Sequence, residues 1–308
     1  MLIWREIPQG WLAVDESSGL CVAGLGGHWH RPWIYPLYTP RGRQVLHAFP
    51  FDHPFHNGCF AGIHPIEYQG RAHNFWASPP QRQDADPMMQ GLGRVLPAAP
   101  PDLKVDGRQW HAQWPLNWWT DDGCLLMREE RTVRIEPGLY AHRMHVQCHW
   151  TANVPLKIPA TKFAGLGVRL DTALTQAAGA RYAPLEDAEA FDALALGAAE
   201  SGADLVRLAG SVPDASVDEL HGRALAAIRV QSAINGDSWG VVLHQARPAV
   251  PWFIRGYGLA LHNPVQAQVV EMTQGQQMEW SIALTAYDLP GAHQGPTAAG
   301  KGYAAHGA

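Results

Sequence analysis

The sequence lacks the two features that mark nucleic-acid-binding and membrane proteins. It carries 23 Lys and Arg against 28 Asp and Glu, a formal net charge of −5, and so has no basic excess of the kind that binds phosphate backbones. It also has no run of about 20 apolar residues that would cross a bilayer. We therefore expect neither nucleic acid nor a membrane among its partners.

Cysteine is scarce and scattered. The four cysteines, at positions 21, 59, 124 and 148, form no C-x-x-C pair and no zinc-binding spacing. A chain of 308 residues also has no need of disulfides to fold. Residues 1–6 lack the basic stretch that precedes the apolar part of a signal peptide. These absences predict reduced thiols and a cytoplasmic location.

What the sequence does contain is a pattern of short strands. There are 31 Gly and 24 Pro, and the stretches between them alternate apolar and polar residues. Residues 125–135 run into a Glu-Pro-Gly turn at 136–138, and residues 144–150 then alternate strictly. We predict an all-β fold, a large antiparallel β-sandwich. It forms a single domain over residues 1–289, followed by a flexible Gly/Ala-rich tail over residues 290–308.

Other segments extend this pattern. Residues 269–284 are predicted to form a second hairpin around a Gln-Gly turn, and residues 223–243 to form two strands around Asn235-Gly236-Asp237. Residues 11–23 and 33–38 are also predicted strands. The sandwich is expected to cover nearly the whole chain.

Two segments break the pattern. Residues 184–200 are rich in Ala, Leu and Glu and begin with Pro184, which predicts a short helical excursion. Residues 77–107 contain many Pro and polar residues and predict a long loop, which is often functional in a compact domain.

The strongest candidate for chemistry is the segment Asp52-His53-Pro54-Phe55-His56-Asn57-Gly58. Two imidazoles three residues apart on a loop would act as acid and base on a ligand, or would hold a divalent metal. Asp52 would orient a neighbouring imidazole by accepting its ring N–H, and Asn57 would contact the substrate. If a metal is bound, candidates for a third ligand are His28, His30, His145 and His149.

Three further segments add candidate residues. Lys162 precedes a Gly-punctuated strand and would reach a ligand oxygen. Tyr35 lies in an aromatic, Pro-rich segment over residues 27–38 that suits the wall of a site. Both are placed in the predicted site.

The last of these segments covers residues 251–264. Trp252 would stack on a sugar ring, and Arg255 would form paired hydrogen bonds to a carboxylate or to vicinal oxygens. Tyr257 and His262 would assist proton transfer. The alternative is that the aromatic side chains belong to the core and that Arg255 pairs with an internal carboxylate.

Taken in order, these segments resemble a family. The stretches 31–40, 52–58, 161–169 and 251–258 are similar to those of the bacterial family known as "PmoA", over roughly residues 25–285. The resemblance implies a β-sandwich of the galactose-mutarotase type, a supersandwich, and a sugar or glycoside substrate. Family members often carry a basic residue or His where Asn57 stands. The segment His221-Gly222-Arg223 also departs from the family pattern.

Three functions remain open. The first is an enzyme that acts on a sugar or glycoside by elimination, hydrolysis or epimerisation, with His53 and His56 as acid and base or as ligands of a divalent metal, the one cofactor considered. A hydrolase would need two facing carboxylates, for which Glu67, Glu129, Glu130 and Glu279 are candidates, although none lies in the segments above. The others are a non-catalytic carbohydrate-binding protein and a metal-dependent oxygenase. The oligomeric state is left open, with a symmetric homodimer the commonest assembly.

Overall fold

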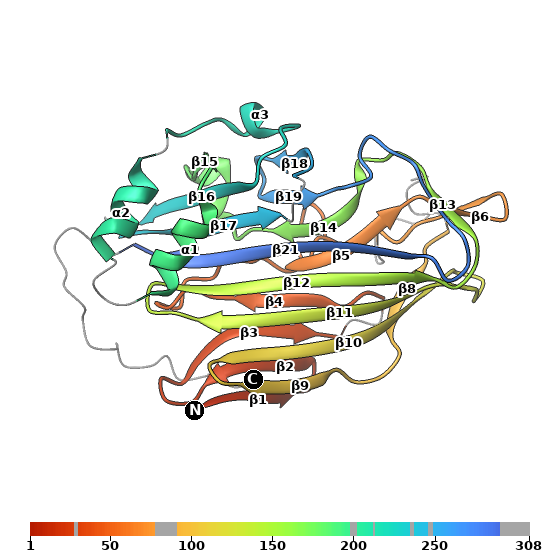
Figure 1. Ribbon diagram of the computed structural model, residues 1–308, viewed down its shortest axis with the longest axis horizontal. Coiled ribbons are helices and arrows are strands. Elements are labelled where there is room, and N and C mark those ends of the chain that lie inside the picture. The colour runs from red at the N-terminus through yellow and green to blue at the C-terminus, as the bar shows by residue number, and fades with distance from the viewer. Residues whose placement is uncertain are drawn as a thin grey trace.

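The computed structural model describes residues 1–27, 30–77, 91–197, 202–211, 213–234, 237–245 and 249–289. Within these residues the strands form three sheets, two of them large. In Figure 1 the long strands β10, β11, β12 and β21 run across the front of the molecule, and β3, β4, β5 and β14 lie behind them. The predicted all-β, antiparallel sandwich is confirmed.

Sheet 1 begins with the N-terminal strands and ends with two strands from late in the chain. The pairs are antiparallel. In spatial order the strands are β1 (Leu2–Ile7), β2 (Gly10–Asp15), β3 (Leu20–Gly26), β4 (Trp33–Leu37), β5 (Cys59–His64), β14 (Phe163–Arg169), β19 (Leu259–His262) and β18 (Trp252–Arg255).

Sheet 2 contains the longest strands. In spatial order they are β15 (Arg181–Leu185), β16 (Ala227–Ile234), β17 (Asp237–Gln245), β21 (Gln277–Asp288), β12 (Ala141–Ala152), β11 (Leu125–Pro137), β10 (Gln109–Trp119) and β8 (Arg94–Pro97), with β9 (Asp102–Asp106) also paired to β10. Sheet 3 is small and consists of β20 (Val270–Met272), β13 (Leu156–Ile158), β6 (Ile66–Tyr68) and β7 (Arg71–His73).

Helices are short and lie outside the sheets. Three α-helices are described, α1 (Ala188–Leu196), α2 (Gly202–Gly210) and α3 (Val217–Leu220), besides the 3-10 turns Thr172–Leu174 and Gln176–Ala178. Asp187 caps α1 by accepting a hydrogen bond from the Ala190 N–H. In the described part of the chain, none of the helices has the length and apolar character needed to cross a membrane.

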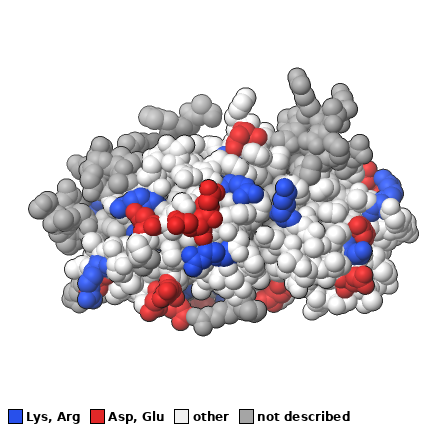
Figure 2. All heavy atoms as spheres, turned by 90° about the horizontal axis from the view of Figure 1, so that it is seen from above, with Lys and Arg blue, Asp and Glu red and all other residues white. Residues whose placement is uncertain are grey.

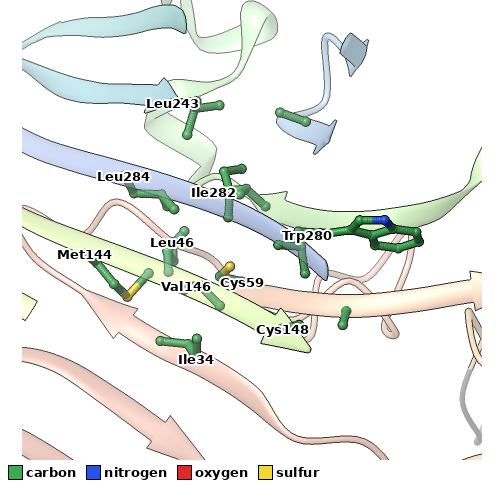
Figure 3. Close-up of a cluster of buried hydrophobic side chains, with 14 of the residues drawn as sticks. Ile34, Leu46, Cys59, Met144, Val146, Cys148, Leu243, Trp280, Ile282 and Leu284 are labelled. Carbon is green, nitrogen blue, oxygen red and sulfur yellow. The ribbon is translucent and has the colours of Figure 1, made fainter. Parts of the chain in front are cut away.

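The main core fills the space between sheets 1 and 2. Figure 3 shows Ile34 and Cys59 from sheet 1 facing Val146, Cys148 and Ile282 from sheet 2. The predicted alternation in β12 is confirmed, because Met144, Val146, Cys148 and Trp150 are all buried here. All four cysteines of the chain are free thiols.

One ion pair lies inside this core. Arg131 Nε is 2.7 Å from Glu129 Oε1, and both side chains are almost completely buried. The indole N–H of Trp118 donates to the other carboxylate oxygen at 2.7 Å. A buried charge pair needs such added hydrogen bonds, because the loss of hydration otherwise outweighs the attraction between the charges.

Three sequence predictions need correction. The predicted helix 184–200 begins only at Ala188, because Pro184 lies in the edge strand β15, where a residue without an N–H is tolerated. The predicted loop 77–107 contains β8 and β9. The predicted hairpin over 269–284 does not form, because β20 pairs with β13 while β21 pairs with β12 and β17.

Other predictions have mixed outcomes. The strands expected over residues 11–23, 33–38 and 223–243 are present as β2, β3, β4, β16 and β17. Residues 235 and 236 of the predicted turn, and the predicted tail 290–308, lie outside the described residues. The division into a single domain and a tail stays a prediction.

Candidate active site

The candidate site lies on the face of sheet 1 that points away from sheet 2. Residues paired across neighbouring strands share a face, and Phe60 pairs with Gly167, Gly167 with Leu261, and Leu261 with Phe253. The alternate residues, among them Cys59 and Val168, belong to the core between the sheets. Phe60, Phe253 and Leu261 instead form a separate buried cluster. This cluster is the floor of the site.

A glycine in β14 makes room for the floor. A Cβ atom on Gly167 would lie 2.4 Å from the Phe60 ring, closer than van der Waals contact allows. With only a hydrogen atom there, the Phe60 ring fits against the strand. The loop over residues 47–58 then covers Phe60 with its histidines.

Asp52, His53 and Arg169 form a hydrogen-bonded group over this floor. Arg169 Nη2 donates to both oxygens of Asp52, at 2.8 and 3.0 Å, and His53 Nδ1 lies 3.0 Å from Asp52 Oδ2. Although partial burial works in the opposite direction, the hydrogen bonds from His53 and Arg169 hold the pKa of Asp52 below its usual value. Asp52 is therefore an ionised carboxylate that accepts the Nδ1–H of His53.

Four aromatic rings stack next to this group. The order is Tyr257, His53, His56 and Phe60, with centroid separations of 4.9, 4.9 and 5.6 Å and nearly parallel planes. Arg169 places its guanidinium carbon 4.7 Å from the Tyr257 ring centroid, a cation–π contact. The structure thus brings together four of the predicted site residues, Asp52, His53, His56 and Tyr257.

The two histidines of the stack differ in exposure. His53 keeps 36% of its side chain exposed, whereas His56 is buried and neither ring nitrogen has a hydrogen-bond partner among the described residues. Burial, together with the positive charges of His53, Arg31 and Arg169, lowers the pKa of His56 well below its usual value. His56 is thus a neutral packing partner, and His53 is the solvent-exposed imidazole of the two.

Tyr257 closes the other end of the stack. Burial raises the pKa of its phenol, against the opposing effect of Arg169 and Arg255. The phenol is therefore protonated near neutral pH and can donate its proton. Together, His53 and Tyr257 give the site one base and one acid side by side.

Arg31, which was not among the predicted site residues, supports the site from inside the protein. It donates to the backbone carbonyls of Phe55 and Trp76, and its guanidinium carbon lies 4.7 Å from the centre of the Phe60 ring. These contacts fix the loop that carries His56 and the segment that carries Trp76, whose ring packs edge-on against His56. The available signals were its position in the aromatic segment 27–38 and in the stretch 31–40 that carries the family resemblance.

Three predicted residues lie outside the ring stack, at the border of the site or in the segments around it. The exposed Lys162 places its ammonium 5.0 Å from the Phe163 ring centroid, and Phe163 in turn contacts Trp76. Asn57 closes the 47–58 loop by accepting the Phe49 N–H. Tyr35 donates to Gln44, 3.3 Å away, outside the stack.

Trp252 and His262 lie on the opposite face of sheet 1 and do not join the site. They pair with each other across β18 and β19 and face the core. The Trp252 indole is fully buried and donates to the Leu225 carbonyl, and His262 Nδ1 lies 2.7 Å from Gln245 Oε1. Burial lowers the pKa of His262 to about 4. Neither side chain can stack on, or exchange protons with, a ligand at His53.

The stacked histidines do not suit the predicted metal. A metal binds an imidazole in the plane of the ring, at about 2.0–2.1 Å from nitrogen. The rings of His53 and His56 are tilted by only 9° and their centroids are 4.9 Å apart, so no point lies in both planes at that distance. Among the described residues, no three His, Cys, Asp or Glu side chains converge as a ligand set. His30 instead contacts the Ala77 carbonyl, and His28 lies outside the described residues.

The outer face of sheet 2 carries a second group of candidate residues. Glu130, His149 and Glu279 are paired neighbours on β11, β12 and β21, and Glu130 and His149 line a hollow of about 410 Å³. His149 Nε2 is 3.2 Å from Glu279 Oε2. Partial burial, together with Glu129, raises the pKa of Glu130. Of the other predicted carboxylates, Glu129 lies in the core and Glu67 pairs with Lys157 at 3.5 Å in sheet 3.

Comparisons with known proteins place the sequence in a family. Residues 27–292 match the model of a family of unknown function, DUF6807. No curated protein matches the sequence. Nothing in the match refers to a methane oxygenase, so the resemblance to the PmoA family stays a prediction.

Solved structures with similar architecture belong to sugar-related proteins. They include a putative aldose 1-epimerase from Escherichia coli (10% identity, 93% of this chain and 98% of that chain covered, TM-score 0.40). A galactose 1-epimerase from Lactobacillus acidophilus gives 7% identity, 94% and 98% coverage and a TM-score of 0.43. A GH36 α-galactosidase from Geobacillus stearothermophilus is 9% identical, with 94% of this chain and 41% of that chain covered and a TM-score of 0.42. Such low scores do not indicate what this chain binds or does.

Proposed function

Since the chain belongs to the DUF6807 family, whose function is unknown, we propose an activity from its own residues: an enzyme that interconverts the anomers of a sugar by acid–base catalysis. The observation that carries the proposal is the side-by-side placement of an oriented imidazole and a protonated phenol, His53 and Tyr257, with ring centroids 4.9 Å apart. Ring opening of a cyclic sugar needs one base and one acid at two oxygens bonded to the same carbon. A neighbouring pair of proton-transfer groups suits that requirement.

His53 is the proposed base. Its Nδ1–H donates to Asp52, which leaves the lone pair of the neutral ring on Nε2, and Nε2 forms no hydrogen bond with the described residues. Asp52 is held by Arg169, so the ring keeps one tautomer and one orientation. When Nε2 takes a proton, the carboxylate stabilises the imidazolium that forms.

Tyr257 is the proposed acid. Its phenol is neutral because burial raises its pKa, and the cation–π contact with Arg169 stabilises the negative charge that develops as the proton leaves. Phe60 and His56 continue the stack behind His53 and hold the pair in place. Lys162 at the border would contact sugar hydroxyl groups.

The reaction conserves every atom. His53 Nε2 takes the proton from the anomeric hydroxyl O1, O1 forms a carbonyl with C1, the bond from C1 to the ring oxygen O5 breaks, and Tyr257 gives its proton to O5. The aldehyde group rotates about the C1–C2 bond. The phenolate then takes the proton back from O5, O5 attacks the other face of C1, and the imidazolium returns its proton to O1.

Polarimetry of freshly dissolved α-anomers of a panel of hexoses and hexuronates tests the proposal. The wild-type protein should accelerate the approach to anomeric equilibrium above the buffer rate for at least one member of the panel. His53→Gln and Tyr257→Phe should each lower that acceleration by about 10²–10⁴-fold, the usual contribution of a general acid or base. The matched control is His149→Gln on sheet 2, which should retain wild-type activity.

Two results would reject the proposal. Acceleration that survives both His53→Gln and Tyr257→Phe would place the chemistry elsewhere. Saturable sugar binding with no acceleration for any member of the panel would instead indicate a carbohydrate-binding protein. A homodimeric assembly, a cytoplasmic location and the absence of nucleic-acid and membrane partners stay predictions.

A further inference from the structure

Arg255 and His221 meet over one aromatic ring at the edge of the candidate site. Arg255 lies on β18, and its guanidinium carbon is 4.1 Å from the centre of the Phe253 ring. His221 follows α3 and packs edge-on against the same ring, with centroids 5.1 Å apart. Phe253 belongs to the floor of the site. Both polar groups therefore rest on the surface that carries the stack.

The tautomer of His221 is fixed by the backbone. Its Nδ1 accepts the N–H of Ile254 at 3.2 Å, so the proton of the neutral ring is on Nε2. Burial and the nearby Arg255 charge lower the pKa of His221, against the opposing effect of Asp218. The side chain is partly exposed, and its Nε2–H is a hydrogen-bond donor next to Arg255.

The positive charge of Arg255 is not neutralised. Its one hydrogen bond among the described residues goes to the Ile254 carbonyl, and no carboxylate in the described part of the chain forms an ion pair with it. Arg169, by contrast, shares two contacts with Asp52. Arg169, Leu259 and Arg255 form one row across β14, β19 and β18, so the cation without a counter-ion lies two strands from the paired one.

This charge acts locally. Figure 2 views the molecule from the side on which α3 and β18 lie in Figure 1, and it shows acidic and basic side chains close together near the middle of that face. Such a surface does not form a long-range field of one sign. A ligand would therefore be selected by direct contact with Arg255 and His221.

We propose that Arg255 and His221 bind a carboxylate, and that the ligand of this site is a hexuronic acid. The inference rests on the proposed function. A hexuronic acid carries its carboxylate on C5, the carbon bonded to the ring oxygen that Tyr257 would protonate. Tyr257 packs against the cluster that contains Phe253, and Arg255 rests on the Phe253 ring, so the cation and the phenol would contact the same side of the sugar. The guanidinium and the Nε2–H together supply donors for both carboxylate oxygens.

Equilibrium binding tests this assignment without requiring turnover. Isothermal titration would compare D-glucuronate and D-galacturonate with D-glucose and D-galactose on the full chain. A charge-assisted pair should make the preferred uronate bind about 10- to 100-fold more tightly than its neutral counterpart. Arg255→Gln should remove that preference, and His221→Phe, which keeps an aromatic contact with Phe253, should reduce it. Arg207→Gln, on the exposed side of α2, is the matched control and should not change it.

The outcomes separate the two proposals. Equal affinity for uronates and neutral hexoses, or a uronate preference that survives Arg255→Gln in a variant with wild-type circular dichroism, would overturn the carboxylate assignment. If Arg255→Gln does not fold, the uronate preference of His221→Phe decides the assignment. An unreduced preference in that variant would overturn it. Anomeric exchange of neutral hexoses without any uronate preference would overturn only this inference. No binding of any of the four sugars would overturn the carboxylate assignment, and polarimetry of the full panel would decide the proposed function separately.

Discussion

The outer faces of the two large sheets carry similar residues in opposite settings. On sheet 1, His53 and His56 stack between Tyr257 and Phe60, and the pKa of His56 is far from its usual value. On sheet 2, His149 lines an open hollow and pairs with Glu279, and both side chains are about half exposed. His53 and His149 each have a carboxylate neighbour and similar exposure, so the comparison teaches that the stacked rings and the second acid–base group beside His53 distinguish the candidate catalytic histidine.

The largest expected effect is a difference in the free energy of unfolding between variants on the two sides of strand β11 in sheet 2. Glu129 faces the core and pairs with Arg131, whereas Glu130 faces the open hollow. Glu129→Gln leaves a buried arginine without its counter-charge and should lower the free energy of unfolding by about 3–5 kcal/mol. Glu130→Gln should change it by less than about 0.5 kcal/mol. Urea denaturation of both variants measures the contrast, and similar values would mean that the two sides are not distinct.

A glycine substitution tests whether the face of sheet 1 is closely packed. A methyl group at Gly167 would collide with the Phe60 ring, so Gly167→Ala should destabilise the protein by about 1–3 kcal/mol. It should also disturb the His53 stack, which near-ultraviolet circular dichroism of Tyr257 and the other aromatic residues would detect. Ser281→Ala on the polar face of sheet 2 is the control and should be nearly neutral. Wild-type stability of Gly167→Ala would show that Phe60 can move aside freely.

Acidification compares the effect of the buried His262 on stability with that of the exposed His149. Burial lowers the pKa of His262 from 6.5 to about 4, so below pH 6.5 the unfolded chain gains a proton there that the folded protein does not. Stability is complete above pH 6.5 and falls as the pH approaches 4. At pH 5.5 this histidine should cost about 1.4 kcal/mol relative to pH 7.5. The decline should be shallower in His262→Gln and unchanged in His149→Gln. Equal declines in all three proteins would remove His262 as the cause.

The smallest expected effect concerns the exposed pair of sheet 2. Glu279→Gln breaks the contact with His149, which lies 3.2 Å away. Exposed ion pairs contribute between about 0 and 1 kcal/mol, and this contribution is screened by salt. Thermal denaturation at low and at high salt should therefore show a small difference that disappears at high salt. A loss above about 2 kcal/mol would mean that the His149–Glu279 pair is more strongly enclosed than the exposure of its two side chains indicates.

Local patterns in the sequence predicted most of the strands. Pairing between residues far apart in the sequence decided how those strands are arranged. The alternation in residues 144–150 depends only on neighbours along the chain, and it placed Met144 and Trp150 in the core correctly. Pro184 looked like a helix start because the sequence does not reveal that it lies in an edge strand. The partner of β20 is β13, more than 100 residues earlier, and no local signal indicates such a pairing.

The same limit applies to the candidate site. Residue type and spacing selected Asp52, His53 and Tyr257, which the fold brings together. Trp252 and His262 have suitable chemistry but face the core, because a strand turns successive side chains to opposite faces and the sequence does not say which face carries the site. Arg169 ended one of the selected segments, yet its pairing with Asp52 spans 117 residues and required the structure.

The central position of β21 has a consequence for how the protein is made. This strand, Gln277–Asp288, lies between β12 and β17 and joins the two halves of sheet 2. While the ribosome is still adding earlier residues, both neighbours have open edges, and such edges recruit strands from other chains. The nascent polypeptide therefore depends on its last described strand to close its largest sheet. Its risk of aggregation is expected to be greatest just before that strand emerges.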